Sequence, residues 1–411
     1  MVKGKRFLSV LLVAVLAGTA LFIFIWALRS GMGTGSLALS TLSLTDLLAG
    51  SPDSTGPDGG YAKALAPRPF SFPADHGPHP DFRNEWWYFT GNLRDKRGKE
   101  FGYQLTFFRS ALAPRGRDTA RISPWASRQV YMAHLAVTEL GSLDGGAGSL
   151  GNGSFQAYER FSRGALGLAG SEISPFHVWL EDWKCESLGG DTSFFPLRLR
   201  AAQGSLSIDL ILEEGKRMVL QGEAGFSRKG PGEGNASYYY SYTRMPTHGT
   251  IKTSAGDFEA GGNSWMDREW GSSILASGIA GWDWFGLQLS DSTDLLFFRL
   301  RSSQSPAGGT GPVRFDYGML IDSHGVDQVL QPEDMRAEIL SLWKSPRGRV
   351  YPARWRMGIP SRGLKLEISP KRSDQELNLS IPYWEGAVDI KAERTGQSLA
   401  GEGYMELTGY R

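Results

Sequence analysis

Tryptophans and carboxylates cluster at three places in the chain, and these clusters are its most chemically suggestive feature. They are Glu85-Trp86-Trp87-Tyr88, Trp265-Met266-Asp267-Arg268-Glu269-Trp270 and Trp282-Asp283-Trp284-Phe285, and together they hold six of the 13 tryptophans. Large aromatic faces favour an apolar ligand, and burial among them disfavours the charged form of a carboxyl group and so raises its pKa. The clusters therefore indicate a ligand pocket that contains acidic groups.

The second cluster supplies the candidate catalytic residues. If it is extended, Trp265, Asp267 and Glu269 share one face, and the two carboxyl groups lie about 6.5–7 Å apart. Buried beside Trp265, they cannot both ionise cheaply, so one is suited to act as a general acid. The candidate catalytic residues are therefore Asp267 and Glu269. The alternative is a structural network in which Arg268 and other basic residues pair with both acids.

Aromatic residues near these acids are the candidates for ligand binding. Trp282 and Trp284 share one face of another predicted strand, and indole faces stabilise a desolvated cation by about 2 kcal/mol. Alternation along Tyr238–Tyr242 places Tyr238 and Tyr240 on one face, and buried tyrosines need a hydrogen-bond partner. Packing in a core or on an outer surface is the alternative for each. The predicted binding residues are Trp265, Tyr238, Tyr240, Trp282, Trp284, Trp87 and Glu85.

Other kinds of chemistry find less support in the sequence. His76 and His79 have the spacing of metal ligands, but they lie in a Pro-rich loop where packing is the simpler role. His134 lies in the middle of a predicted strand, as a core histidine would. The only cysteine, Cys185, excludes a disulfide framework and a cysteine-based metal site. No nucleophile elbow, phosphate-binding loop or dinucleotide motif is present, so we expect neither a metal nor a cofactor.

The composition predicts an all-β protein. The chain has 53 glycines and 12% aromatic residues, and short alternating segments are separated by glycine turns. Each half contains about eight candidate strands, enough to close a small barrel around one ligand. One short helix is predicted at residues 332–340, and a mobile Gly/Ser loop at 141–153. The net charge of +1 gives no indication of nucleic-acid binding.

The N-terminus predicts a membrane address. Lys3, Lys5 and Arg6 precede an uncharged apolar run at Phe7–Leu28, and its 22 residues can cross a bilayer core of ~30 Å as a helix. Residues 1–30 are therefore expected to form a signal anchor, with the body outside the cytoplasm. The alternative is a signal peptide cleaved near Ala38–Ser40, which would release a secreted protein. Residues 31–67 are expected to form a flexible linker.

The sequence resembles the AttH-like proteins related to carotenoid 1,2-hydratase (CrtC). The resemblance covers about residues 68–411. It is carried by Phe72–His76 with His79, Glu85–Leu93, Phe101–Arg109, Tyr239–Ser241 with Gly249-Thr250, Gly262–Gly271 and Gly281–Phe285. It implies two lipocalin-like (calycin-type) antiparallel β-barrels in tandem, at residues 68–271 and 272–411, after the membrane helix. It also implies that Asp267 supplies the acid, with Trp265 and Tyr240 lining a carbocation.

Two functions follow from the residues and the resemblance together. The first is a hydratase-like enzyme that adds water to an apolar polyene or lipid, as relatives do to a terminal carotenoid double bond. The hydratase branch places a His where this chain has Tyr238, so the carotenoid itself is not implied. The second is a non-catalytic carrier of a hydrophobic ligand, or an accessory to an ABC export system, since many relatives are linked to transporter permeases. The sequence does not identify the ligand or the barrel that holds it.

Overall fold

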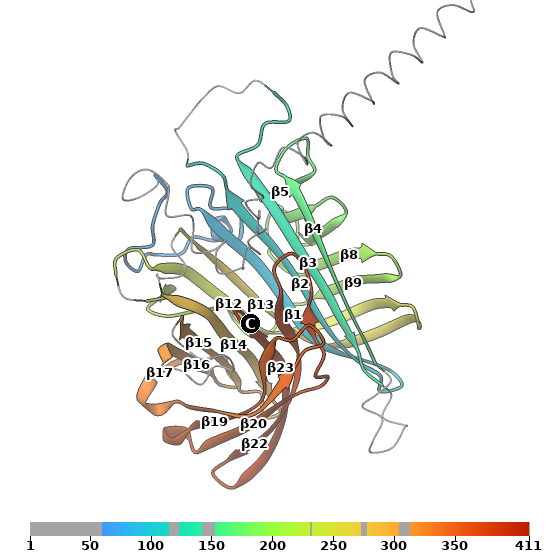
Figure 1. Cartoon of the computed structure of the whole chain (residues 1–411). Helices are drawn as coiled ribbons and strands as arrows, with labels where there is room; N and C mark the ends of the chain where they lie inside the picture. Colours follow the sequence, from blue (N-terminus) through green and yellow to red (C-terminus); the bar gives the residue numbers. More distant parts are fainter. Residues whose placement is uncertain are drawn as a thin grey trace, which may run out of the picture. The chain divides into compact units, whose positions relative to one another are not determined.

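Alternating side chains and glycine turns give this chain an almost purely antiparallel β fold (Figure 1). The structure, a computed structural model, describes residues 60–114, 123–141, 153–230, 232–272, 278–303 and 313–410. The predicted membrane helix, the possible cleavage site, most of the linker and most of the 141–153 loop lie outside these ranges. In the part of the chain described, no helix is long and apolar enough to cross a membrane.

The first sheet has 13 strands and covers the N-terminal half of the body. Its order is β4-β3-β2-β1-β13-β12-β9-β8-β7-β6-β5, and β10 and β11 also pair with β12. Strand β6 contacts β2, β3 and β4, so the sheet curls back over its own core. The strands are β1 (Asn84–Asp95), β2 (Glu100–Ala111), β3 (Gln129–Glu139), β4 (Ser154–Arg163), β5 (Ala169–Ile173), β6 (Phe176–Leu180), β7 (Trp183–Ser187), β8 (Leu197–Gln203), β9 (Leu206–Leu212), β10 (Val219–Leu220), β11 (Phe226–Arg228), β12 (Ala236–Thr253) and β13 (Gly256–Gly271).

The second sheet has 10 strands and follows in sequence. Its order is β17-β16-β15-β14-β23-β22-β20-β19-β18, with β21 paired to β22. The strands are β14 (Ile279–Leu289), β15 (Asp294–Ser302), β16 (Val313–Ile321), β17 (Asp327–Leu330), β18 (Arg336–Lys344), β19 (Val350–Ile359), β20 (Leu364–Pro370), β21 (Glu376–Leu377), β22 (Tyr383–Arg394) and β23 (Gln397–Leu407). Three single-turn 3₁₀ helices complete the described elements: η1 (Ala74–His76), η3 (Pro332–Asp334) and η4 (Pro360–Arg362).

Each sheet surrounds its own apolar core, and a third core lies between the two sheets. Trp87 and Tyr103 belong to the first core, and Phe285 and Trp355 to the second. The third core lies where β1, β2 and β12 contact β23, β22 and β14, respectively. The strands that meet there are buried on both faces, because one face lines a barrel and the other meets the opposite sheet. Both side-chain sets of such a strand are therefore available for packing or chemistry.

Polar contacts also join the two sheets. Thr138 Oγ1 donates a hydrogen bond of 2.7 Å to Gln375 Oε1, and Asn92 Nδ2 donates one of 3.0 Å to the Gly403 carbonyl. Lys371 Nζ lies 2.8 Å from Glu100 Oε2. These contacts fix the position of one sheet against the other.

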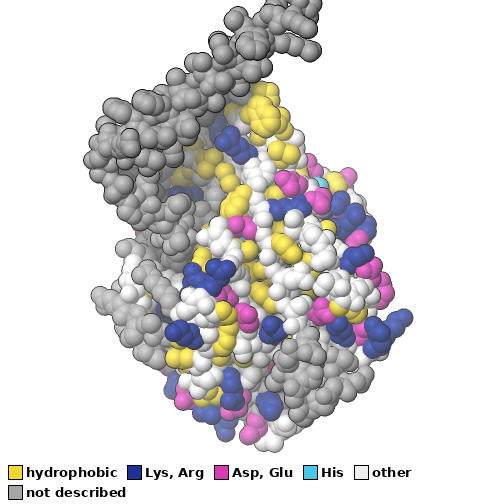
Figure 2. Space-filling view, turned by 45° about the vertical axis from the view of Figure 1, so that its right-hand side comes forward, with side chains coloured by type: hydrophobic (Ala, Val, Ile, Leu, Met, Phe, Trp, Pro, Cys, Tyr) yellow, Lys and Arg dark blue, Asp and Glu magenta, His cyan; other side chains and the backbone are white. Residues whose placement is uncertain are grey.

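The outer surface carries charges of both signs. On the face drawn in Figure 2, the basic and acidic side chains of the described residues are interspersed. This mixture agrees with the near-zero net charge of the whole chain.

The all-β prediction with two curled antiparallel sheets is confirmed. The predicted helix at residues 332–340 is wrong: η3 ends at Asp334, and β18 begins at Arg336 and pairs with β19. Ala337 and Ile339 pack against the second core while Arg336 and Glu338 face outward, so a two-residue period prevails over local helix propensity. Strand β12 runs without a break from Ala236 to Thr253, with a register shift against β13 between Tyr242 and Met245.

Candidate active site

A cavity of about 80 Å³ lies between the two sheets. This volume holds several water molecules or the reacting end of a longer ligand. Strands β1, β2, β12 and β13 form one wall and β14, β15, β22 and β23 the other. The lining residues are Trp86, Tyr88, Thr106, Phe108, Lys229, Tyr239, Asp267, Glu269, Trp282, Trp284, Phe298, Leu300, Tyr383, Glu385 and Glu406. We call this space the acid cavity, after its four carboxyl groups.

Strand alternation decides which side chains reach the acid cavity. On β13, Asp267 and Glu269 line it, whereas Arg268 and Trp270 point into the first barrel. On β14, Trp282 and Trp284 line it, and Phe285 packs in the second core. These orientations agree with the two faces expected from the sequence.

Asp267 is held by three donors from the first sheet. Tyr239 Oη donates to Oδ2 at 2.5 Å, while Ser241 Oγ and Trp265 Nε1 donate to Oδ1 at 2.6 and 2.7 Å. These bonds favour the carboxylate, but burial outweighs them and raises the pKa of Asp267 to about 7. Asp267 is therefore poised to gain or lose a proton near neutral pH.

Glu269 has the cavity's ammonium group as its partner. Lys229 Nζ lies 3.0 Å from Glu269 Oε1, and Ser237 Oγ also donates a hydrogen bond to that oxygen. The same ammonium lies over the Phe298 ring, 4.3 Å from its centroid. Glu269 is thus an ion-paired carboxylate, which makes it a weaker candidate for a proton donor than its neighbour two residues away.

Two further acids reach the cavity from the second sheet. Glu385 on β22 is 1% exposed, and neither carboxyl oxygen has a hydrogen-bond partner among the described residues. Burial and the negative charge of Glu406 raise the pKa of Glu385 well above its usual range, although the Tyr88 and Tyr383 hydroxyls act to lower it. Glu406 on β23 accepts a 3.0 Å hydrogen bond from Trp282 Nε1. Burial and the negative charges of Asp267 and Glu269 raise the pKa of Glu406 as well.

The charge balance of the acid cavity is therefore uneven. Four carboxyl groups share the space with a single lysine, Lys229. Like charges held close together in a desolvated space do not all ionise, so some of these acids carry protons near neutral pH. A pocket of this kind can donate a proton and can also stabilise a positive charge.

Aromatic rings give the cavity its apolar walls. Trp284 packs edge-on against Trp265, with ring centroids 5.8 Å apart, and edge-on against Tyr88 at 5.2 Å. Gly286 permits this packing, because a Cβ there would lie 2.4 Å from the Trp284 ring. The half-buried rings of Trp86, Phe108 and Trp282 are the more exposed part of the lining.

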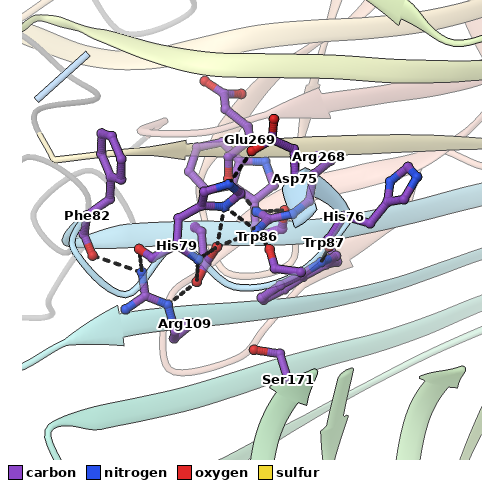
Figure 3. Close-up of polar contacts among 12 residues, drawn as sticks. Asp75, His76, His79, Phe82, Trp86, Trp87, Arg109, Ser171, Arg268 and Glu269 are labelled. Carbon is purple, nitrogen blue, oxygen red and sulfur yellow. Dashed lines mark hydrogen bonds and ion pairs between the residues drawn. The ribbon is translucent and has the colours of Figure 1, made fainter. Parts of the chain in front are cut away.

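A second polar cluster lies on the opposite face of β1 and β13 (Figure 3). We call its members, Asp75, His79, Glu85, Arg109 and Arg268, the arginine cluster. Glu85 is fully buried and forms ion pairs with both Arg109 and Arg268. Burial alone would raise the pKa of Glu85, but the two guanidinium groups bring it well below its usual range.

His79 joins the two ends of the arginine cluster. Its Nε2 lies 2.9 Å from Asp75 Oδ1, and its Nδ1 accepts a 3.1 Å hydrogen bond from Arg268. Its ring stacks on Trp270 with centroids 3.7 Å apart, and the Arg268 guanidinium lies 4.0 Å from the Trp87 ring centroid. Every ionisable group of this cluster has a partner of opposite charge or a hydrogen bond, as in a structural network.

The predicted site residues divide between the two faces. Asp267, Glu269, Trp282 and Trp284 line the acid cavity, and Trp265 bonds to Asp267 beside it. Four other predicted residues lie on the barrel side of their strands and do not line this cavity: Glu85, Trp87, Tyr238 and Tyr240. The physical reason is the two-residue period of β1 and β12, which sends their neighbours Trp86, Tyr88 and Tyr239 to the cavity instead.

His76, in the Pro-rich loop, takes part in a hydrogen bond and a ring stack. His76 Nδ1 lies 2.7 Å from Tyr240 Oη, and its ring stacks on Phe194 at 3.7 Å. Burial and the positive charge of Arg268 lower the pKa of His76 to about 3, so this imidazole is neutral. Within the ranges that the structure describes, no group of three or more His, Cys, Asp or Glu side chains could hold a metal ion.

Comparison with known sequences and structures places this chain in a family. The profile of AttH-like proteins matches residues 63–410. The chain belongs to the AttH-like family. Among solved structures, an AttH-type protein from Nitrosomonas europaea is 34% identical with a TM-score of 0.71, over 85% of this chain and 100% of that chain. Kievitone hydratase from Nectria haematococca shares the fold at 14% identity and a TM-score of 0.61, over 85% of this chain and 98% of that chain. No curated protein matches the sequence.

The AttH-like resemblance found in the sequence is thus confirmed, but the sequence motifs marked only half of the cavity. Glu385, Glu406 and Lys229 line it and were not predicted, nor was Tyr239. One signal was present, since Trp384-Glu385 repeats the pairing of tryptophan and acid seen in the three opening clusters. Lys229 follows the short strand β11, and no pattern marked it. In this AttH-like chain the second sheet supplies as many acids as the first.

Proposed function

We propose that this AttH-like protein catalyses acid-assisted addition of water to an alkene, or the reverse elimination, on an apolar polyene or lipid held in the acid cavity. One observation carries the proposal. Glu385 is a buried carboxyl group that faces an aromatic cavity and has no hydrogen-bond partner among the described residues. Such a group is expected to hold its proton at neutral pH until a substrate accepts it.

The two sheets would supply the acid and the base. In the proposed reaction, Glu385 donates its proton to one carbon of a trisubstituted alkene, and a tertiary carbocation forms at the other carbon. Water attacks that carbon, and the proton lost from the water passes to Asp267. The sum is alkene plus water giving a tertiary alcohol, and the cycle closes when Asp267 releases its proton to solvent and Glu385 regains one. The different surroundings of the two acids support this division of roles, because Asp267 accepts three hydrogen bonds that favour its carboxylate and Glu385 accepts none among the described residues.

The cavity walls suit a short-lived cation. Trp284, Trp282 and Phe298 present aromatic rings to the space between the acids. A desolvated cation gains up to about 2 kcal/mol over such a ring. Glu269 also lines this space, and its carboxyl oxygens, one of which pairs with Lys229, would attract a cation there. We assign Glu269 this electrostatic role within the proposed reaction.

The relatives support a hydration reaction. The name of kievitone hydratase describes an enzyme that adds water to kievitone, and that protein shares the fold. At 14% identity the likeness extends to the fold alone, so the acids of this chain carry the assignment. The aromatic lining equally suits a carrier that holds an apolar ligand without turnover, for instance beside an ABC export system. Experiment separates the two.

The test uses purified full-length protein with geraniol, farnesol and lycopene as probes, each of which ends in a trisubstituted alkene. Products are analysed by mass spectrometry in isotopically labelled water, beside extraction of any ligand that copurifies. Glu385→Gln is expected to lower turnover by about 10²- to 10⁴-fold and Asp267→Asn by a similar factor. Glu338→Gln, an exposed substitution on β18, is the matched control and should keep full activity.

Bound lipid without turnover of any probe by the wild-type protein would support the carrier. Turnover that survives Glu385→Gln unchanged would contradict the assigned acid.

We also propose that the body is held outside the cytoplasm by residues 7–28. The support is the 22-residue apolar run with basic residues before it. Protease added to spheroplasts should digest the body, and without protease the protein should stay with the membrane fraction. Full protection of the body inside intact spheroplasts would overturn the proposed location.

A further inference from the structure

A chain of polar side chains leads from the surface of the first sheet to the acid cavity. Glu159 on β4 has a side chain that is 13% exposed, and its Oε2 lies 3.1 Å from Nε2 of the fully buried His134 on β3. The other ring nitrogen of His134, Nδ1, lies 2.8 Å from Tyr383 Oη on β22. Tyr383 lines the acid cavity two residues before Glu385.

We propose that Glu159, His134 and Tyr383 relay protons between solvent and Glu385. The inference rests on the proposed function, in which Glu385 loses a proton in each hydration cycle and must regain it. It assigns three positioning residues to that cycle, none of which was among the predicted site residues. His134, which the sequence predicted to be a core histidine, would then also transfer protons between Glu159 and Tyr383.

The surroundings of Glu385 favour this route over the neighbouring groups. Two tyrosine hydroxyls act on the carboxyl group, those of Tyr88 and Tyr383. The Tyr88 hydroxyl has no hydrogen-bond partner in the part of the chain that the structure describes. The Tyr383 hydroxyl is bonded to His134 and so continues outward to Glu159. Glu406 is occupied by the Trp282 indole.

The transfer balances as a shift of one proton along the chain. Burial raises the pKa of Glu159, but hydrogen bonds with His134 and Ser380 bring it below its usual range, so solvent protonates Glu159 only transiently. Glu159 passes that proton to His134 Nε2, and the proton on Nδ1 moves to Tyr383 Oη. The hydroxyl proton of Tyr383 moves to the Glu385 carboxylate. His134 ends in its other tautomer and Tyr383 is unchanged in charge, while Glu159 has lost one proton and Glu385 has gained it. Burial lowers the pKa of His134, so the imidazole relays as a neutral ring.

The last step needs Glu385 to swing toward Tyr383. The two side chains do not form a hydrogen bond of normal geometry, although Tyr383 interacts with the carboxyl group electrostatically. Both line the same cavity, which leaves room for a change of rotamer. Because Glu385 must change rotamer to reach Tyr383, it would donate its proton to the substrate in one orientation and regain a proton from Tyr383 in another.

The experiment measures recharging of Glu385 without any substrate. Full-length protein is mixed rapidly into D₂O at neutral pH, and the carbonyl stretch of protonated carboxyl groups is followed by infrared spectroscopy. Glu385→Gln identifies the band. Tyr383→Phe removes one hydroxyl and keeps the ring. It is expected to slow deuterium exchange at Glu385 by about tenfold or more, which is less than the rate effect of about 10²- to 10⁴-fold typical of a positioned proton-transfer group. Glu159→Gln tests the outer end of the relay and should also slow exchange.

Tyr131→Phe is the matched control. Tyr131 lies on β3 with His134, but its hydroxyl faces Ser171 in the first barrel, so exchange should keep the wild-type rate. Exchange as fast in both Tyr383→Phe and Glu159→Gln as in the wild type would overturn the relay, since water would then reach Glu385 directly. If Glu385→Gln removes no carbonyl band, Glu385 is ionised, and the proposed acid fails together with its relay. Wild-type turnover with unslowed exchange in the variants would reject the relay alone.

Discussion

The two faces of β1 and β13 carry polar clusters of opposite electrostatic character. In the arginine cluster, Glu85 lies between two guanidinium groups, and the pKa of Glu85 is lowered. In the acid cavity, Asp267 and Glu385 are equally buried, but the pKa of each is raised. Burial is common to both faces, so the charge of the partners decides the difference. In the arginine cluster, each acid pairs with a basic group and stays ionised. In the acid cavity, the acids outnumber the single lysine, so some of them can gain and lose protons near neutral pH.

This contrast also separates stability from chemistry. A buried ion pair need not stabilise the fold relative to apolar side chains, but removing one partner leaves an uncompensated charge and is costly. An unpaired acid that already holds its proton has no such partner to lose. Substitutions in the arginine cluster should therefore act on folding, and substitutions in the acid cavity on proton transfer.

The largest effect is expected when the arginine cluster is broken. Glu85→Leu removes the carboxylate that both Arg109 and Arg268 share. We expect the free energy of unfolding to fall by about 3–5 kcal/mol, because two buried guanidinium groups lose their counterion. Denaturant unfolding of the purified protein measures this loss.

Glu338→Gln supplies the control for that measurement. Glu338 pairs with Arg356 on the surface of the second sheet, and both side chains are more than half exposed. Its loss should leave the free energy of unfolding almost unchanged, because solvent screens an exposed ion pair. If Glu85→Leu proved as mild as this surface substitution, the arginine cluster would not hold the fold, and the comparison of the two faces would lose one side.

The sequence identified the strands and most of the acidic and aromatic residues of the two clusters. It did not identify which face of each strand lines the acid cavity. Alternation along β13 put Asp267 and Glu269 together, because side chains of a strand point to opposite faces. Alternation does not say which face meets the other sheet, since both faces are apolar and buried. For this reason Tyr240 was predicted for the pocket, and Tyr239 lines it.

The acids of the cavity's second wall could not be predicted from the sequence, for another reason. Glu385 lies 118 positions after Asp267 in the sequence, and only the packing of one sheet on the other brings both to the same space. Contacts of this kind leave no local pattern. An acid beside a tryptophan, as in Trp384-Glu385, is a sign of a buried acid, but it does not distinguish the unpaired Glu385 from Glu85, which stands beside Trp86 and is ion-paired.

A second prediction sharpens the comparison through pH. Because the pKa of Glu85 is lowered by folding, its contribution to stability is present above its unfolded pKa and is lost as the pH falls through the folded value. Because the pKa of Asp267 is raised to about 7, its contribution is present below its unfolded pKa and is lost as the pH rises toward about 7. The two clusters should therefore show slopes of opposite sign.

The measurement is the free energy of unfolding across pH for the wild type, Glu85→Gln and Asp267→Asn. The wild-type advantage over Asp267→Asn should shrink between about pH 4 and about pH 7, by at most about 1.4 kcal/mol per pH unit. The wild-type advantage over Glu85→Gln should instead shrink on acidification. If the wild-type advantage over Asp267→Asn and the wild-type advantage over Glu85→Gln changed with pH in the same direction, the arginine cluster and the acid cavity would not differ in electrostatic character.

The smallest expected effect comes from a single hydroxyl in the acid cavity. Tyr239→Phe removes the 2.5 Å hydrogen bond that the Tyr239 hydroxyl donates to Asp267 Oδ2. It also removes the 3.3 Å hydrogen bond that this hydroxyl accepts from Trp284 Nε1. The pKa of Asp267 should rise further, because that bond favours its carboxylate, and the free energy of unfolding should fall by about 1 kcal/mol. Tyr242→Phe, on the barrel face of the same strand, removes a hydroxyl without touching Asp267 and should leave its titration unchanged. If both variants moved the titration of Asp267 equally, its pKa would be set by the barrel as a whole, and not by the donors within the cavity.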